Sequence, residues 1–312
     1  MLRYYKNNEL VLEKMDEPVT NCWIDAINPT PDEKQLLCNL GIPMDFITYS
    51  LDIDERSRIE EEDNGTTLIV VRIPYFMGES EDIPYITIPL GIILTDKYIV
   101  TVCEKSTETI EMFASGKAPK LSTTKRNRFA LRILMRGTTN FLDDLRAINK
   151  TVDALEDKLY ASMQNTELLE MLKYQKSYVY FAQALKQNEL ALYRISKLSS
   201  FKRYEEDEDL IEDVIIENTQ AMDMTNISSS ILSSLMDAFA SVISNNLNVV
   251  MKLLASVTII LSIPNVISGF FGMNINFPDV IETHEFTMIV IFGIIILFTF
   301  FAIYIFQKKN WF

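Results

Sequence analysis

Twelve residues in the last third of this 312-residue chain recur at alternating steps of three and four, and eleven of them are small or polar. Such spacing keeps one face of a helix turned towards a common axis. The hydroxyl and amide oxygens on this face can hydrogen-bond to water or to a neighbouring helix, whereas an ordinary coiled coil is apolar at this spacing. We call this set the seam: Ser230, Ser234, Asp237, Ser241, Ser244, Asn248, Met251, Ala255, Thr258, Ser262, Asn265 and Gly269.

The seam runs into the first of two uncharged stretches, residues 253–271 and 286–306. Each is about as long as the ~20 residues that a helix needs to cross ~30 Å of hydrocarbon. Because only a short loop joins them, we expect a membrane hairpin. Polar groups at bilayer depth are tolerated where they face protein or a water-filled path.

Two interpretations of the seam are open. Small and polar residues can hold two membrane helices together through close packing and interhelical hydrogen bonds. Alternatively, several copies of the helix surround a water-filled axis. The length of the seam favours the second, because packing motifs tend to be local. Two spans cannot enclose a pore, so this interpretation requires a symmetric homo-oligomer.

Composition excludes several other classes of protein. The net charge of −14 argues against a nucleic-acid partner, which needs clustered Lys and Arg. The three cysteines, Cys22, Cys38 and Cys103, have no paired spacing and predict reduced thiols rather than disulfides or a zinc site. The sequence contains no phosphate-binding loop and no dinucleotide fingerprint, and His284 is its only histidine. We therefore expect neither an enzyme nor an organic cofactor.

The charges that flank the hairpin predict its orientation. Lys252 lies at the start of the first stretch, Lys308 and Lys309 follow the second, and the joining loop has no Lys or Arg. We expect a multi-pass membrane protein with both termini cytoplasmic and the loop external.

The part before the hairpin changes from mixed to helical. Strands are predicted at 66–73, 85–88, 91–94 and 98–103, and prolines at 84 and 89 favour an edge position for the second. Helices are predicted at 31–40, where Thr30 and Glu33 form a capping box, and at 43–51. From about residue 125 the pattern is helical, with the acidic run 205–209 interpreted as a solvated turn. No Gly or Pro interrupts the chain from Leu210 to Pro264, which predicts one long stalk helix.

The expected fold is an α+β cytosolic domain of α/β/α layers, followed by a long stalk helix and two transmembrane helices. Six segments follow from this division: a cytosolic domain at 1–130, a helical stalk region at 131–248, a pore-lining helix at 249–272, an external loop at 273–285, a second transmembrane helix at 286–306 and a basic tail at 307–312.

The tripeptide Gly272-Met273-Asn274, at the outer end of the first span, resembles that of the CorA family of magnesium channels. The stretches 248–254 and 262–265, the basic-aromatic tail 308–311 and the segment 54–60 are also similar to this family. The residue before the tripeptide departs from the family's usual Tyr, because it is Phe271.

This resemblance implies a homopentameric funnel in the cell (inner) membrane, with Mg²⁺ as transported and regulatory ion. Asn274 would receive the hydrated ion at the outer mouth, with Gly272 and Met273 beside it, and magnesium's reluctance to shed water suits such an amide. Met251 and Leu254 would form an apolar constriction, although ordinary helix packing is the alternative for Met251. The implied pore-lining residues are Asn248, Met251, Leu254, Ala255, Thr258, Ser262, Asn265 and Gly269.

The resemblance also implies regulation by acidic residues. In the family, cytosolic Mg²⁺ bound at acidic residues favours channel closure. Asp213 resembles such a residue by its distance in sequence from the membrane span, and Asp82 is a candidate for the second ligand of the same ion. The acidic loop residues Asp279, Glu282 and Glu285 would raise the cation concentration near the mouth.

Two other functions stay open. Cobalt and nickel are further candidate cargoes, and a zinc transporter on the same scaffold is the nearest alternative, although softer ligands would be expected along its path. The other alternative is a membrane-anchored sensor or scaffold that transports nothing. No ATPase motif is present, so the membrane potential is the expected driving force.

Overall fold

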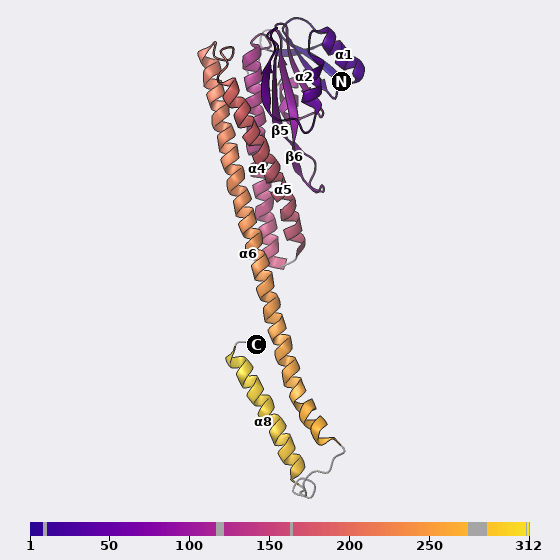
Figure 1. Ribbon diagram of the computed structural model, residues 1–312, viewed down its shortest axis with the longest axis vertical. Helices are drawn as coiled ribbons and strands as arrows, with labels where there is room; N and C mark the ends of the chain where they lie inside the picture. Colours follow the sequence, from indigo (N-terminus) through magenta and orange to yellow (C-terminus); the bar gives the residue numbers. More distant parts are fainter. Residues whose placement is uncertain (9–10, 117–121, 163–164, 274–285, 310, 312) are drawn as a thin grey trace. The chain divides into compact units, whose positions relative to one another are not determined.

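The computed structural model describes residues 1–8, 11–116, 122–162, 165–273, 286–309 and 311 (Figure 1). They form two compact units, Met1–Ser234 and Leu235–Phe312. The first unit contains a seven-stranded sheet with the order β2-β1-β3-β7-β6-β5-β4, in which only β3 and β7 pair in parallel. The strands are β1 (Leu2–Asn8), β2 (Val11–Met15), β3 (Cys22–Ile27), β4 (Arg58–Glu61), β5 (Thr67–Phe76), β6 (Tyr85–Leu94) and β7 (Tyr98–Cys103).

Helices cover both faces of this sheet. On one face α1 (Pro31–Asn39) and α2 (Met44–Leu51) pack through Leu37 and Phe46 against Leu68 and Val70 of β5. On the other face lie α3 (Glu108–Ala114), α4 (Arg126–Ser162) and α5 (Asn165–Ile195). The predicted α/β/α layers are therefore confirmed, and the capping box of Thr30 and Glu33 opens α1 as expected.

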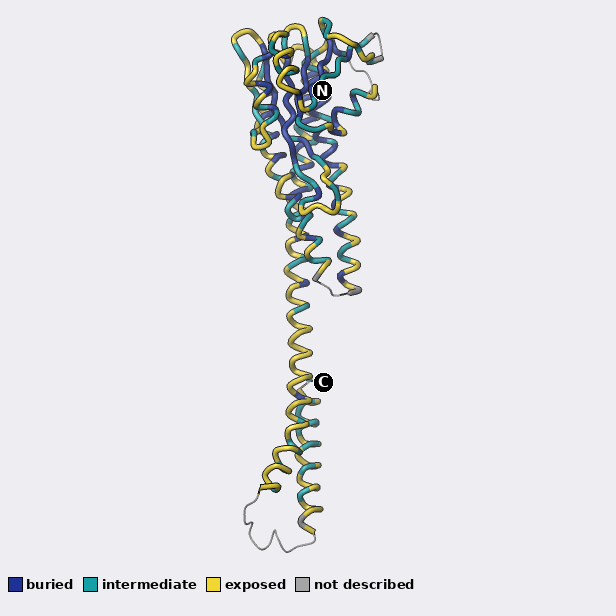
Figure 2. The backbone as a smooth tube through the Cα atoms, turned by 90° about the vertical axis from the view of Figure 1, so that its right-hand side faces the viewer, coloured by how far each residue is buried: buried dark blue, intermediate teal, exposed yellow. Residues whose placement is uncertain are grey.

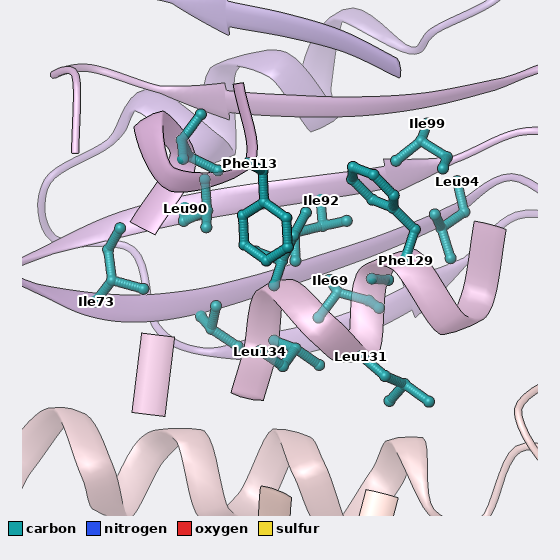
Figure 3. Close-up of a cluster of buried hydrophobic side chains, with 14 of the residues drawn as sticks. Ile69, Ile73, Leu90, Ile92, Leu94, Ile99, Phe113, Phe129, Leu131 and Leu134 are labelled. Atoms are coloured by element: carbon teal, nitrogen blue, oxygen red, sulfur yellow. The ribbon is translucent and has the colours of Figure 1, made fainter. Parts of the chain in front are cut away.

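The larger core lies between the sheet and α4. Successive residues of a strand point to opposite faces, so Ile69 and Ile73 of β5 face away from Leu68 and towards α4. Figure 3 shows Phe129 and Leu134 of α4 meeting these strand residues. Their full burial gives α4 a fixed place on the sheet, in keeping with the ~25 cal/mol that each Å² of buried apolar surface contributes.

Where β4 no longer pairs with β5, a side chain of α5 forms hydrogen bonds with the β5 backbone. β4 pairs with β5 only as far as Val70, and just beyond it Asn188 binds both backbone groups of Arg72. Its Oδ1 accepts from the Arg72 N–H at 2.9 Å, and its Nδ2 donates to the Arg72 carbonyl at 2.8 Å. The Ser57 hydroxyl also donates to Asn188 Oδ1, at 2.7 Å. These bonds fix α5 to the sheet.

The expectation that residues 85–88 form a separate edge strand is wrong. β6 runs without interruption through Pro89 and lies between β5 and β7. Pro89 pairs with Arg72, whose own N–H and C=O point to Asn188, so the nitrogen of Pro89 faces away from β5. On that other side the pairing with β7 ends at Leu90 and Cys103. Proline is tolerated here because no ladder donor is required.

The acidic run 205–209 is not the solvated turn that its charge predicted. It forms the first turn of α6 (Glu205–Phe271), where carboxylates are stabilised by the helix dipole. Asp207 is buried, and Arg128 of α4 forms ion pairs with both Glu206 and Asp207. The first four strands, β1 to β4, were also not predicted individually.

α6 begins in the first unit and ends in the second, and it continues past Pro264 to Phe271. The predicted long helix is thus confirmed. The second unit also contains α8 (Thr287–Lys308). By length and composition, α6 and α8 are the helices in the described chain that could cross a membrane, as the two apolar stretches predicted.

Candidate functional site

The part of α6 in the second unit is exposed along most of its length in the single chain (Figure 2), and the seam residues are among the exposed ones. Met251 and Leu254, the residues of the implied constriction, are 56% and 59% exposed in the single chain. The helix therefore places these residues on its surface, where only another chain, lipid or water can meet them. The remaining predicted pore residues are also exposed: Asn248, Ala255, Thr258, Ser262, Asn265 and Gly269.

Two hydroxyl groups of the seam donate hydrogen bonds to backbone carbonyls of their own helix. Thr258 Oγ1 donates to the Leu254 carbonyl at 2.8 Å, and Ser262 Oγ donates to the Thr258 carbonyl at 2.7 Å. Each oxygen keeps lone pairs that can accept a further hydrogen bond. The seam at these two positions is therefore an acceptor surface, which suits the O–H donors of a hydrated cation.

Of the seam residues, only Ser262 lines the groove between α6 and α8, its neighbouring helix in the second unit. A groove of about 410 Å³ between α6 and α8 is lined mainly by apolar side chains, among them Ile259, Ile263, Val266 and Phe298, with Ser262 at its border. Ser256 is fully buried, and its hydroxyl donates to the Lys252 carbonyl. Thus the off-seam Ser256 is covered and the seam residues are exposed, although Ser268, which is also off the seam, is exposed as well.

Gly272 lies directly after the last helical residue, Phe271. Its N–H donates to the Ser268 carbonyl at 2.9 Å, and the Met273 N–H donates to the Phe270 carbonyl at 3.4 Å. A Cβ on Gly272 would lie 3.1 Å from the Ser268 oxygen, closer than most such contacts, so the helix end favours glycine. Met273 is 53% exposed. The predicted residues Asn274, Asp279, Glu282 and Glu285 lie outside the described residues.

The two predicted regulatory carboxylates have different surroundings. Asp82, in the turn between β5 and β6, accepts a hydrogen bond from Lys176 Nζ of α5 at 2.7 Å, and this bond lowers the pKa of Asp82. Asp213 of α6 is exposed and has no ion pair within the described residues. Within the described residues, no hydrogen bond or ion pair joins Asp82 to Asp213. Lys176 was not predicted, because 94 residues separate it from Asp82.

Within the described ranges, no group of three or more His, Cys, Asp or Glu side chains is arranged to hold a metal ion. Cys22 and Cys103 are buried in the sheet, and Cys38 is partly buried in α1. All three cysteines belong to the first unit. They form no disulfide, as the sequence predicted.

A family model and a relative both match nearly the whole chain. The model of the family described as CorA-like Mg²⁺ transporter protein matches residues 19–309. The protein called cobalt/magnesium transport protein CorA, from Methanocaldococcus jannaschii, is 28% identical over 321 residues, which cover 98% of this chain and 97% of the relative.

Solved structures share the fold. The complete structure of the CorA magnesium transporter from M. jannaschii superposes with a TM-score of 0.85 at 24% identity, covering 100% of this chain and 99% of the other. The cytoplasmic domain of ZntB from Vibrio parahaemolyticus gives a TM-score of 0.61 at 11% identity, covering 78% and 98%. Both likenesses concern the arrangement of helices and strands.

Proposed function

This chain belongs to the family of CorA-like Mg²⁺ transporter proteins, and on that premise we propose that it carries divalent cations, Mg²⁺ above all, across a membrane. The family match confirms the resemblance first drawn from Gly272-Met273-Asn274. The observation that carries the proposal is the exposed seam from Asn248 to Gly269, on a helix long and apolar enough to span a bilayer. We propose cobalt as a second cargo, because the relative's name includes it.

The proposed path is the seam of several copies of α6. Hydrated Mg²⁺ would meet Asn274 at the outer mouth and then the acceptor oxygens of Asn265, Ser262 and Thr258, keeping water that it sheds reluctantly. Met251 would close the path by dewetting. No step makes or breaks a covalent bond, so the protein would act as a channel and not as an enzyme.

A homo-oligomer, with five copies as the family implies, would complete this path. Apolar side chains on the outward face of α6 in the first unit support it. Ile216, Ile227 and Ile231 are 59%, 60% and 62% exposed, and they line an open groove of about 760 Å³. Three isoleucines at such spacing favour burial against another chain over contact with water.

The proposed orientation places both termini in the cytoplasm, with residues 1–130 and the helical region 131–248 on that side. The negative-inside membrane potential would then drive uptake, supplying about 4.6 kcal/mol for each divalent ion at ~100 mV. Cytosolic Mg²⁺ at Asp213 and Asp82 of adjacent copies would favour the closed state. To bind Asp82, Mg²⁺ would have to displace Lys176.

The alternatives have less support. Zinc transport predicts sulfur or imidazole ligands along the path. However, all three cysteines lie outside residues 249–306, and His284 is the only histidine. A membrane anchor that transports nothing gives no reason for small and polar residues at heptad spacing along α6.

The test is flux into liposomes that contain the purified protein and carry an inside-negative potential. We expect Mg²⁺ to enter, Zn²⁺ to enter less readily, and Asn274→Ala to reduce Mg²⁺ entry strongly. A matched control is Asn127→Ala, because Asn127 lies in α4, far from the spans in sequence. Absence of Mg²⁺ entry in the wild-type protein would leave the anchor interpretation, and a preference for Zn²⁺ would support the zinc alternative.

A further inference from the structure

The segment 54–60 resembles the family's cytosolic domain but has no part in the proposed transport path. It runs from the loop after α2 into β4 in the first unit and borders a cavity of about 230 Å³. The other lining residues come from strands β5 and β6 and from helix α5. The polar side chains that line this cavity belong to Asp54, Arg56, Arg72, Thr87, Tyr180 and Gln183, with Gln187 beside them.

Arg72 is a partly buried cation whose side chain donates no hydrogen bond to a carboxylate within the described residues. Its Nη1 donates to the carbonyls of Ile53 and Glu55 at 2.9 and 3.0 Å. Its Nη2 and Nε donate to Thr87, to the carbonyl at 2.6 Å and to the hydroxyl at 3.1 Å. These bonds use four of the five N–H groups of a guanidinium and leave one on Nη2. Burial lowers the pKa of Arg72, since desolvation disfavours its charge.

Arg56 and Asp54 are the other charged side chains that line the cavity. Both side chains are exposed, and neither forms a hydrogen bond or ion pair within the described residues. Asp54 lies near enough to Arg72 to stabilise its charged form, which opposes the effect of burial. Two cations and one carboxylate give the cavity a net charge of +1. A partly desolvated positive charge of this kind is stabilised by an anion.

We propose that this cavity binds a phosphate group that carries a proton. Arg56 and the remaining N–H of Arg72 would donate to its oxygens, as guanidinium groups commonly do. Asp54 would accept a hydrogen bond from the P–OH group. Sulfate has the same shape but no proton at neutral pH. It could not donate a hydrogen bond to the Asp54 carboxylate, and the two negative charges would repel each other. The carboxylate therefore makes the site selective for phosphate over sulfate.

The size of the cavity suits this ligand. Four oxygens, at the ~30 Å³ that a water occupies in the liquid, fill about half of it. Free inorganic phosphate fits whole, whereas a nucleotide could place only its terminal phosphate inside. The proposal concerns the first unit alone and holds whether or not the chain transports ions.

The test is calorimetric titration of the full-length wild-type protein in metal-free buffer with inorganic phosphate, sulfate and ATP at matched ionic strength. We expect phosphate to bind at least tenfold more tightly than sulfate. Arg56→Gln should weaken phosphate binding about tenfold or more, since a charge-assisted hydrogen bond is lost. Asp54→Asn should remove the preference over sulfate. Arg194→Gln is the matched control, because Arg194 is exposed on α5, away from the residues that line the cavity.

Each result of the titration either supports or overturns the phosphate site. Binding that is lost in Arg56→Gln and kept in Arg194→Gln supports the site, and the tighter of phosphate and ATP names the source of the phosphate group. Equal binding of phosphate and sulfate by the wild-type protein overturns the proposal. So does the absence of binding, or an equal loss in both arginine variants. Exposed Arg56 and Asp54 have no structural bonds to lose, and a thermal melt of each variant checks that it folds.

Discussion

Two serines of α6 allow a matched test of the seam. Ser262 and Ser256 each donate their hydroxyl proton to the carbonyl four residues earlier, at 2.7 Å. Ser262 is exposed on the seam, whereas Ser256 is fully buried off it. Replacing either one with alanine removes the same group from the same backbone setting. Only Ser262→Ala should then remove an oxygen that an ion's hydration water could reach.

The magnitude follows from the bond that is lost. Because its proton is already used, Ser262 can offer water an acceptor, and a net hydrogen bond contributes about 0.5–1.5 kcal/mol. At ~1.4 kcal/mol for each factor of ten, Ser262→Ala should slow Mg²⁺ flux about two- to tenfold. Ser256→Ala should leave flux within about twofold of wild type. Flux would be measured in liposomes at a fixed potential. An unchanged Ser262→Ala, or an equal fall in Ser256→Ala, would refute the assignment of the seam.

Three further outcomes follow from the first unit. Asn188→Ala should destabilise the protein by about 2–4 kcal/mol in denaturant unfolding, because the backbone N–H and C=O of Arg72 lose their partner; a change below ~0.5 kcal/mol would contradict this. Burial, reinforced by nearby carboxylates, raises the pKa of Asp144 to about 7 from its ordinary 3.8. The folded state therefore binds this proton more tightly, and stability from this group falls as the pH rises from about 4 to 7. Asp144→Asn should flatten that slope and stabilise the protein at pH 8 by up to ~4 kcal/mol, measured by unfolding at pH 5 and pH 8. Lys176→Met should lower the Mg²⁺ concentration that closes the channel, by less than about fivefold because the Lys176–Asp82 pair is exposed; an increase would count against regulation at Asp82.

Local rules predicted those elements whose signals are local. The capping box of Thr30 and Glu33 identified α1, and the two apolar stretches identified the C-terminal part of α6 and the whole of α8. Pro89 led to the wrong prediction of an edge strand. Proline is tolerated at this position because the paired residue, Arg72, directs its backbone N–H and C=O to Asn188, which comes 99 residues after Pro89 in the sequence. No local pattern could have shown this.

The candidate site was predictable to a similar extent. Helical spacing alone placed the seam residues on one face, and the structure leaves them exposed together with most other residues of that part of α6. The acidic run 205–209 was misinterpreted because its counter-charge, Arg128, lies on another helix. The partner of Asp82 was missed for the same reason: ion pairs between distant segments follow from packing, which a single sequence does not display.

The central claim is that the seam of α6 faces water in the assembled protein, and thiol accessibility tests it most directly. Ser262→Cys and Leu261→Cys place a thiol on adjacent residues, turned ~100° apart around the helix. Both would be made with Cys38→Ser, since the other two native cysteines are buried. We expect a charged, membrane-impermeant thiol reagent to modify Ser262→Cys and block Mg²⁺ flux, while Leu261→Cys stays unmodified. Modification of Leu261→Cys alone, or of neither variant, would contradict this expectation.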